Sequence, residues 1–454
     1  VRIEAGDVVV DGAISADGAA GSGFRAGGGS GGTISIAANG LFGAGVIQAN
    51  GGGDELGGGG GRVFIAYSTL GGPGNDLNGT RAITAYGGRG NQGSGSAGTV
   101  VLRGPGQAYG GLYIDDGRDA TAPARTPLTH IGFGSVAAVT SDTLTTGGLV
   151  RMIPGALAGL ELAPNITRAE SYRVIANTED TLTVDLAGGP ALDSVAAPGD
   201  TYVGVYRFEN VTLRGGGFFE LGDMLLVSGA MDITEWGVLT HYDAATAFES
   251  RLDLTVGALW IAGTGAIDVS GRGYLGGLHN QSEDYGLTLG NLPGSTPYAG
   301  GSHGGLGGAT SGTPNPVYGN AEQPGALGAG GSRGASGRRG GDGGGRVFIY
   351  AGAATVDGVI RADGEAGTGF SAAGGAGGSI WLVTPALDGA GSMVAGGGGN
   401  EVGGGGGRVA IVYDGGQSDL GTLGITAPGG AGNQASGAEG TVFLDAGPVA
   451  PPAF

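Results

Sequence analysis

The sequence Gly-Gly-Gly-Gly-Gly-Arg-Val-Phe-Ile-Ala-Tyr occupies residues 57–67, and Gly-Gly-Gly-Gly-Gly-Arg-Val-Ala-Ile-Val-Tyr occupies residues 403–413. Each stretch is a run of glycines followed directly by β-branched and aromatic residues, a composition that is typical of a β-strand. A run of five glycines is too long to be a turn alone. We therefore expect ordered glycine segments to alternate with short strands.

The two stretches belong to a long internal duplication. Asp11–Gly18 recurs as Asp357–Gly364, and the match continues without a gap through both quoted stretches at a constant offset of 346 residues. After a four-residue deletion it resumes at an offset of 342, from Asn91 and its counterpart Asn433. Roughly the first and the last hundred residues are therefore copies of one unit. Because both termini fall inside that unit, we expect the chain to be a segment of a longer repetitive protein.

A shorter period lies inside each copy. Strand-like runs open at Arg2, Thr33, Arg62 and Thr99 in the first copy and at Arg346, Ser379, Arg408 and Thr441 in the second. A repeat of this length cannot bury its apolar face alone and must stack on its neighbours. We therefore predict an all-β fold, a parallel β-helix or β-solenoid with glycine-rich loops of polyglycine II type and one small inserted antiparallel β domain. The handedness of such a solenoid is not encoded in these patterns.

The abundance of glycine, 111 of 454 residues, needs a physical reason. Each glycine in regular structure costs about 0.5–1 kcal/mol of backbone entropy relative to alanine. Turns that require positive φ recover part of this cost, and close approach of extended glycine segments whose amides bond one another recovers more. The alternative is that the glycine runs are flexible spacers. The constant loop length between the two copies favours ordered segments.

The composition changes between the copies, and glycine becomes sparse after about Thr126. Short β-branched runs separated by Asn, Gly and Pro turns are typical of a small antiparallel β domain or barrel. The predicted organisation is glycine-rich solenoid coils over 1–125, the inserted β domain over 126–205, β-helix coils over 206–270, a long glycine-rich irregular segment over 271–345 and the second copy over 346–454.

Charge and composition exclude several classes of function. The chain has 40 acidic residues against 21 basic ones, a net charge of −19, no cysteine and, among the basic residues, only arginine. This charge makes nucleic acid and anionic membrane surfaces poor partners. Without cysteine or lysine there are no disulfides, thiolate nucleophiles or Schiff bases. No run of 18 apolar residues occurs, so we expect no membrane insertion.

An ordered succession of glycine motifs carries a resemblance to known proteins. These motifs are Gly300–Gly308, Tyr318-Gly319, Gly328–Gly331, Gly343–Ile349, Val356–Gly364 and Gly403–Val409. The chain resembles the glycine-rich repeat regions of very large secreted or surface proteins of bacteria, and it is similar to plant wall-associated glycine-rich proteins. The likeness covers roughly residues 1–105 and 256–448. It implies an extracellular or cell-surface location and no catalytic residues.

Calcium is the one cofactor for which the sequence offers candidates. Residues 71–78 fit the start of a calcium-binding nonapeptide and place Asp76 at its acidic position, although an apolar residue is missing at position eight and the other copy lacks the match. A second acidic cluster holds Asp115, Asp116 and Asp119. We take these four residues as candidate calcium ligands, with solvated turns as the alternative interpretation.

Aromatic residues gather in the irregular segment 271–345. Long irregular segments often carry binding sites, and rings with a polar edge suit sugars. The candidate glycan-binding residues are Tyr274, Tyr285, Tyr298, His303 and Tyr318. The alternative is that these rings pin the glycine loops to the flank of the solenoid.

Two clusters of carboxylates are candidates for catalysis, because β-helices often carry polysaccharide-cleaving sites. Asp115, Asp116, Arg118 and Asp119 form one candidate cluster, and Asp232, Glu235, His241 and Asp243 form another. Both equally fit solvated turns, so no catalytic residue is assigned and we expect the chain not to be an enzyme. Ice binding would require regular Thr-x-Thr ladders, and only isolated pairs such as Thr181 and Thr183 occur.

The combined prediction is a structural or adhesive fibre or stalk protein of the extracellular space or cell surface. We expect it to associate with itself into a filament or matrix by stacking end to end, with a surface polysaccharide as a further partner. The alternative is a glycan-binding or polysaccharide-cleaving β-helix module.

Overall fold

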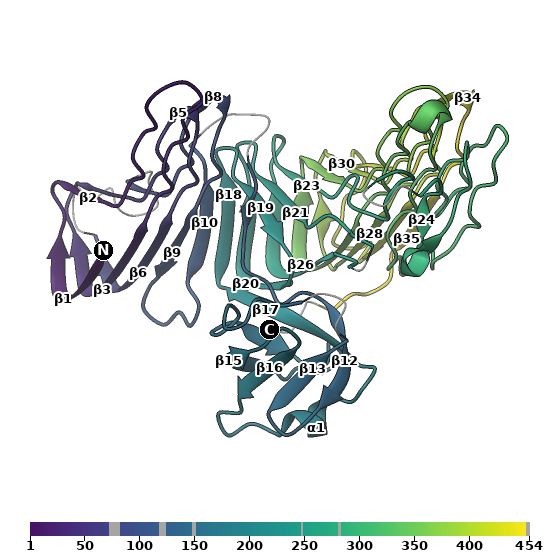
Figure 1. Ribbon diagram of the computed structural model, residues 1–454. Helices are drawn as coiled ribbons and strands as arrows, with labels where there is room; N and C mark the ends of the chain where they lie inside the picture. Colours follow the sequence, from purple (N-terminus) through teal and green to yellow (C-terminus); the bar gives the residue numbers. More distant parts are fainter. Residues whose placement is uncertain (72–81, 118–123, 148–150, 247, 280–282, 451–454) are drawn as a thin grey trace.

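A computed structural model describes residues 1–71, 82–117, 124–147, 151–246, 248–279 and 283–450. The fold is all-β, with 42% of residues in strands and 2% in helices. Within the described residues the strands form a 19-stranded sheet, a seven-stranded sheet, a three-stranded sheet and three strand pairs. Figure 1 shows the large sheet running across the molecule, a barrel below its centre and glycine-rich loops above both of its ends.

The large sheet contains the strands that open each repeat and the strands between the two copies. In spatial order they are β1 (Arg2–Val9), β3 (Thr33–Phe42), β6 (Arg62–Leu70), β9 (Thr99–Arg103), β10 (Gly111–Asp115), β18 (Asn210–Arg214), β20 (Met224–Ile233), β22 (Leu252–Ile261), β26 (Arg346–Val356), β28 (Ser379–Thr384) with β29 (Leu387–Asp388), β32 (Arg408–Tyr413) and β35 (Thr441–Asp445). Neighbours pair in parallel except β9 and β10, which are antiparallel.

The start of each repeat strand is confirmed. All eight predicted openings, from Arg2 to Thr441, are the first residues of strands in this sheet. The register also follows the repeat, because Arg62 pairs with Thr33 and Thr99, whereas Arg408 pairs with Ser379 and Thr441. The alternation of a buried and an outward side chain along each run therefore sets the same face of every strand toward the core.

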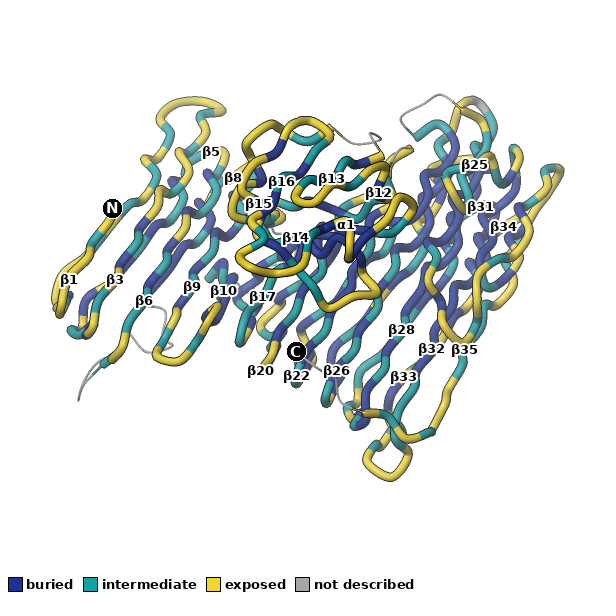
Figure 2. The backbone as a smooth tube through the Cα atoms, turned by 90° about the horizontal axis from the view of Figure 1, so that it is seen from below, coloured by how far each residue is buried: buried dark blue, intermediate teal, exposed yellow. Residues whose placement is uncertain are grey.

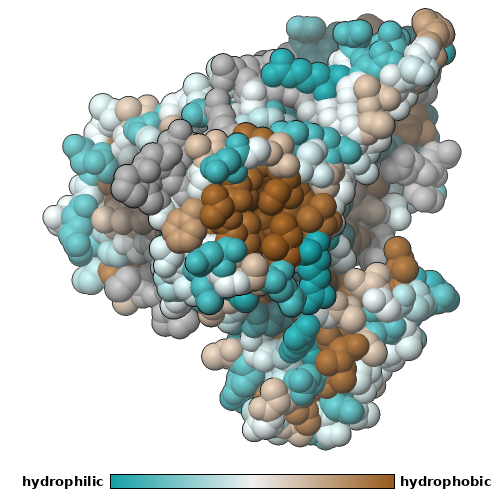
Figure 3. Space-filling view, turned by 90° about the vertical axis from the view of Figure 1, so that its left-hand side faces the viewer, coloured by the Kyte–Doolittle hydropathy of each residue, from teal (hydrophilic) through white to brown (hydrophobic). Residues whose placement is uncertain are grey.

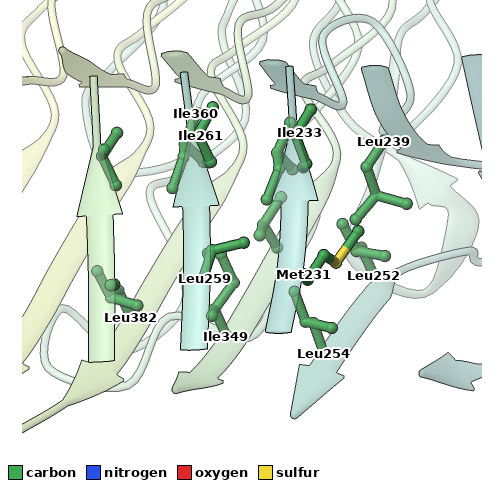
Figure 4. Packing of buried hydrophobic residues seen from close by; sticks show 14 of the residues in the cluster. Met231, Ile233, Leu239, Leu252, Leu254, Leu259, Ile261, Ile349, Ile360 and Leu382 are labelled. Carbon is green, nitrogen blue, oxygen red and sulfur yellow. The ribbon is translucent and has the colours of Figure 1, made fainter. Parts of the chain in front are cut away.

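Two further parallel ladders lie behind the large sheet. One contains β11 (Thr126–Pro127), β19 (Phe218–Leu221), β21 (Val238–His241), β23 (Ala266–Asp268), β27 (Val359–Arg361), β30 (Ser392–Val394) and β33 (Gly424–Thr426), and the other contains β2 (Ala13–Ser15), β4 (Val46–Gln48) and β7 (Ile83–Thr84). Aliphatic side chains fill the space between the ladders, and Figure 4 shows Ile261 and Ile360 facing one another from β22 and β27. Both are fully buried. Two hydrophobic clusters hold the ladders to the large sheet, one behind the three-stranded ladder of the first copy and one behind the seven-stranded ladder.

A closed barrel is inserted between β11 and β18. Its strands are β12 (Gly134–Val139), β13 (Thr143–Thr146), β14 (Glu161–Ala163), β15 (Tyr172–Asn177), β16 (Thr181–Asp185) and β17 (Thr201–Phe208), with the short helix α1 (Leu192–Val195). They close in the order β12–β13–β16–β15–β14–β17–β12, and every pair is antiparallel. The end of β17 also pairs in parallel with β20 and thereby fixes the barrel to the large sheet. Figure 2 shows the barrel lying over the middle strands of that sheet.

The predicted fold class, a parallel β-helix or β-solenoid with polyglycine II loops and a small inserted domain, is wrong. The barrel is hydrogen-bonded into the same 19-stranded sheet as the repeat strands, and that sheet mixes antiparallel with parallel pairs. The physical reason lies in two chain reversals that the repeat does not contain. A hairpin over residues 104–110 turns β10 back along β9. Residues 134–208 fold as antiparallel hairpins, without the long glycine runs that precede the repeat strands.

The glycine runs form a chain of backbone hydrogen bonds that we call the glycine relay. In the first copy Gly52 N donates to Gly29 O (2.8 Å), Gly58 N to Gly52 O (2.9 Å) and Gly88 N to Gly58 O (2.7 Å). The same bonds recur in the second copy at the matching residues. There Gly398 N donates to Gly375 O (2.8 Å), Gly404 N to Gly398 O (2.8 Å) and Gly430 N to Gly404 O (2.8 Å).

The relay leaves no space for side chains. A Cβ atom at Gly58 would lie 2.1 Å from Gly29 O, and one at Gly404 would lie 2.0 Å from Gly375 O. Carbon and oxygen atoms do not approach this closely without a covalent bond, so these positions require glycine for steric reasons. The relay is flanked by two parallel strand pairs, β5 (Asp54–Leu56) with β8 (Gly90–Gly93) and β31 (Asn400–Val402) with β34 (Gly432–Ala435).

The remaining short elements lie in the segment between β23 and β26. A two-stranded hairpin pairs β24 (Leu287–Thr288) with β25 (Leu292–Pro293), and single 3-10 turns span Leu289–Asn291 and Ala335–Gly337. No helix within the described ranges is long and apolar enough to cross a membrane.

Replacement of one relay glycine tests this packing. We expect Gly404→Ala to destabilise the protein by at least the 1–3 kcal/mol or so that is typical of overpacking, because the backbone at Gly375 must move. Gly263→Ala is the matched control, since a Cβ there would meet nothing closer than 3.9 Å. Denaturant unfolding of both variants measures the difference. Equal stability of the two variants would contradict a close-packed relay.

Candidate functional site

Of the four predicted calcium ligands, Asp115 and Asp116 lie in the described part of the chain. Asp76 and Asp119 lie outside the described residues. Asp115 forms an ion pair with Arg214 (Oδ2 to Nε, 2.7 Å), and the buried Asp116 accepts a hydrogen bond from Gly87 N (2.8 Å). Across the described residues there is no group of three or more His, Asp or Glu side chains that could hold a metal ion. The calcium site remains a prediction.

The predicted glycan-binding residues lie mainly inside the protein. Tyr274 and His303 are fully buried, whereas Tyr285, Tyr298 and Tyr318 are half-buried. The His303 ring packs against Tyr318 with centroids 4.9 Å apart, and its Nδ1 lies 2.9 Å from Gly377 O. Burial lowers the pKa of His303 to about 4. This placement fits the alternative interpretation, in which the rings hold glycine loops in position.

Tyr274 nevertheless leads to an unpredicted cavity. Its hydroxyl donates to Glu249 Oε1 (2.9 Å), and burial raises the pKa of that hydroxyl. Glu249 and the neighbouring Leu327 line a cavity of about 1040 Å³ between the barrel, the segment that precedes β22 and the irregular segment. This volume lies at the upper end of the range for small-molecule sites.

The cavity has aromatic walls and a cationic floor. Its walls include Phe133, Tyr202, Tyr242, Phe248 and His130, and its arginines are Arg62, Arg151, Arg251 and Arg346. Glu249 is the one carboxylate among its lining residues. The four arginines outnumber the carboxylates next to them, Glu249, Asp253 and Glu179, so a small excess of positive charge remains here and favours an anionic ligand.

Arg251 is held by an aromatic ring and a shared carboxylate. Its guanidinium lies 3.8 Å from the centroid of Phe133, and its Nε lies 3.2 Å from Asp253 Oδ2. Arg346 Nη2 lies 3.5 Å from the other oxygen of Asp253. Because two guanidiniums share one carboxylate, the pair carries a net positive charge. Burial lowers the pKa of Arg251 to about 10, which leaves it charged at neutral pH.

Ser250 carries an unpaired polar group behind the cavity wall. The residue is 1% exposed, and its Oγ has no hydrogen-bond partner within the part of the chain that is described. Asn291 Oδ1, also on the cavity wall, likewise lacks a partner there. Buried polar groups are normally hydrogen-bonded, but both atoms are closed to solvent in this structure, so a ligand reaches them only if the cavity wall moves.

Two members of the second predicted carboxylate cluster, His241 and Asp243, contact an arginine network beside this cavity, whereas Asp232 lies on β20 and Glu235 in the turn that follows it. Arg272 Nη1 contacts Asp243 Oδ1 (2.9 Å) and Glu220 Oε1 (3.2 Å), and Arg125 contacts the same two carboxylates. Burial lowers the pKa of His241 to about 3, and its Nε2 accepts a hydrogen bond from Arg346 N (3.2 Å). These side chains neutralise one another and fix the chain beneath the cavity.

Asp223 anchors the chain where it enters the barrel. The side chain is buried, and its carboxyl oxygens accept hydrogen bonds from Ile131 N (3.1 Å) and Gly132 N (2.7 Å). Burial raises the pKa of Asp223 to about 7. This residue therefore sets the position of Ile131 and Phe133, which line the cavity.

The two ends of the large sheet form a second kind of candidate surface. In the described structure β1 pairs only with β3 and β35 pairs only with β32, so each has one free edge. Figure 3 shows an apolar patch on the face of the molecule at the β1 end. Ile3, Val8 and Ile14 pack against the core at this end and stay half-exposed. At the other end, Val442 and Leu444 of β35 are 44% and 47% exposed.

Comparison with known proteins adds no assignment. No protein-family model, curated protein or solved structure matches this chain significantly. Function must therefore be inferred from the cavity, the sheet ends and the glycine relay.

One signal in the sequence points to part of the cavity. Arg251 and Arg346 each precede an apolar run that opens a strand, as Arg62 does. Because β22 and β26 pair with Leu252 opposite Val347, these two arginines lie side by side. Phe133 and Ser250 carry no comparable signal, since only the position of the barrel brings them to the cavity.

The pH dependence of stability tests the Asp223 anchor. A folded-state pKa raised from 3.8 to about 7 stabilises the folded protein below pH 4, and this contribution is lost as the pH rises through 7. We therefore expect the stability advantage of the wild type over Asp223→Asn to shrink between pH 4 and pH 8. Unfolding midpoints at both pH values measure it, with Asp193→Asn, an exposed carboxylate, as the control. A difference in stability between wild type and Asp223→Asn that stays the same at both pH values would contradict the raised pKa of Asp223 in the folded protein.

Proposed function

We propose that this chain is a structural or adhesive protein of the cell surface or extracellular matrix that associates end to end. The free edges of β1 and β35 carry the proposal. Unpaired strand edges are templates for pairing with another chain unless they are covered or blunted. The apolar patch at the β1 end supports the proposal because apolar surface favours association.

The geometry of the ends favours a filament over a closed pair. A contact between the β1 end of one copy and the β35 end of the next joins two different surfaces, and such heterologous contacts generate open filaments unless the rotation closes a ring. The strong negative charge of each molecule opposes association at low ionic strength. Filament growth should therefore increase with salt.

A charge placed in the apolar patch tests the sheet-end contact. We expect Val8→Asp to weaken end-to-end association more than about tenfold, because an unpaired carboxylate would be buried in the contact. Val9→Asp is the matched control, since successive side chains of a strand point to opposite sides and Val9 is 65% exposed. Sedimentation and negative-stain electron microscopy measure the assemblies. Filaments of unchanged length in Val8→Asp would rule out this contact.

The cavity favours a second candidate function, a glycan-binding or polysaccharide-cleaving module. Its aromatic walls suit the apolar faces of sugar rings, and the pair Arg251 and Arg346 suits a carboxylate or sulfate group. The ligand class that fits best is an acidic oligosaccharide. Unpaired Ser250 Oγ and Asn291 Oδ1 would serve sugar hydroxyls.

Removal of the unpaired Ser250 hydroxyl tests ligand binding in the cavity without affecting the stability of the fold. We expect Ser250→Ala to weaken binding of a galacturonate tetrasaccharide roughly two- to tenfold, the value of one neutral hydrogen bond, without lowering stability. The exposed Ser228→Ala is the control. Titration calorimetry measures the affinity, and chromatography of the recovered sugar reports cleavage. Equal affinity for a neutral glucose tetrasaccharide would contradict the role of the arginines.

A further inference from the structure

The duplication places one surface in two different environments. In the second copy the glycine run 403–407 is entirely buried beneath the irregular segment. Gly405 N donates to Gly301 O (2.9 Å), and Gly406 O accepts from Gly304 N (3.1 Å) and Gly305 N (2.8 Å). An extended glycine segment of the chain thus docks on the relay of the second copy.

The docked segment also forms hydrogen bonds with residues of the second repeat unit outside the glycine run 403–407. Ala376 N donates to Ala329 O (2.8 Å), and Ala438 N donates to Leu306 O (2.8 Å). Arg408, which is 7% exposed, donates from Nη2 to Tyr318 O (2.8 Å). Backbone groups make most of the contact, together with the guanidinium of Arg408, the hydroxyl of Ser379 and the ring of His303, whose Nδ1 lies 2.9 Å from Gly377 O.

In the first copy, no described segment docks on the matching surface. Ser30, the counterpart of the fully buried Ala376, is exposed, and so is Arg62, the counterpart of Arg408. The amides of Ser30, Gly59 and Ser96 have no protein partner among the described residues. A Cβ at Gly59 would meet nothing closer than Ser96 Oγ at 3.6 Å, whereas a Cβ at Gly405 would lie 2.0 Å from Gly305 O. We call this surface, formed by residues 27–31, 57–62 and 96, the bare glycine face.

We propose that the bare glycine face docks on the same face of a second copy of this chain. On this surface, the second repeat unit binds an extended glycine segment through backbone amides and carbonyls. The bare glycine face of another molecule offers the same backbone groups. Because both partners use the same surface, the contact is isologous and makes a two-fold dimer. It lies on the glycine relay and is separate from the sheet ends, so it would join filaments side by side.

Steric blocking of the face provides the test. Gly59→Val fills open space in the monomer and should leave its fold intact, but the side chain would stand between two docked backbones. Gly263→Val is the matched control, also in open space and far from the face. Both variants are made in the Val8→Asp background, so that sheet-end association does not contribute.

Sedimentation of the full chain at about 0.15 M salt, where the Debye length is about 8 Å, measures the dimer. We expect at least a tenfold weaker dimer in Gly59→Val and no change in Gly263→Val. Hydrogen exchange should show the Gly59 amide exchanging fast in the monomer and slowly in the dimer, while the Gly405 amide is slow in both. A protein that stays monomeric, equal dimers in both variants, or a protected Gly59 amide in the monomer would each overturn the proposal.

Discussion

The close approach of glycine backbones is the constraint on which the structure depends. At Gly58 and at Gly404, a carbonyl oxygen of another segment occupies the place of a Cβ atom. The entropy cost of ordering glycine is offset there by hydrogen bonds between segments and by van der Waals contact along bare backbone. The relay sets the distance between successive repeats, and that distance brings the strands that begin at Arg62 and Arg408 into register with their neighbours.

The barrel changes what this stack can do. A continuous array of repeats offers similar surfaces along its whole length, whereas the barrel covers the middle of the large sheet (Figure 2). Residues of the barrel also line the cavity beside this sheet. Asp223 fixes the entry of the barrel by bonding the backbone at Ile131 and Gly132. Sheet edges, cavity and bare glycine face therefore come from three parts of one chain. Arg62 belongs both to the bare glycine face and to the cavity lining, so association at that face and ligand binding share this residue.

The repeat strands could be predicted from the sequence because their signal is local. A glycine run followed by Arg and alternating apolar residues specifies both where a strand starts and which side is buried, as at Arg62 and Arg408. The fold class could not be predicted, because the antiparallel turn between β9 and β10 and the closure of β12 on β17 depend on contacts between distant segments. The site was missed for the same reason. Ser250 and Phe133 are ordinary residues until the barrel places them on one cavity, whereas Tyr274 and His303, conspicuous in the sequence, are buried.

The glycine relay, a layer built without side chains, also differs from an ordinary protein surface in its resistance to deamidation, oxidation and proteolysis. The glycine runs of the relay contain no amide to deamidate, no sulfur or indole to oxidise and no side chain for the specificity pocket of a protease to grip. Their backbone groups are largely committed to neighbouring segments, so a protease cannot draw them into its own strand pairing. The chain as a whole has neither lysine nor cysteine, which removes two further sites of chemical modification. Resistance to chemical modification and proteolysis is thus expected from the same packing that makes the relay intolerant of substitution.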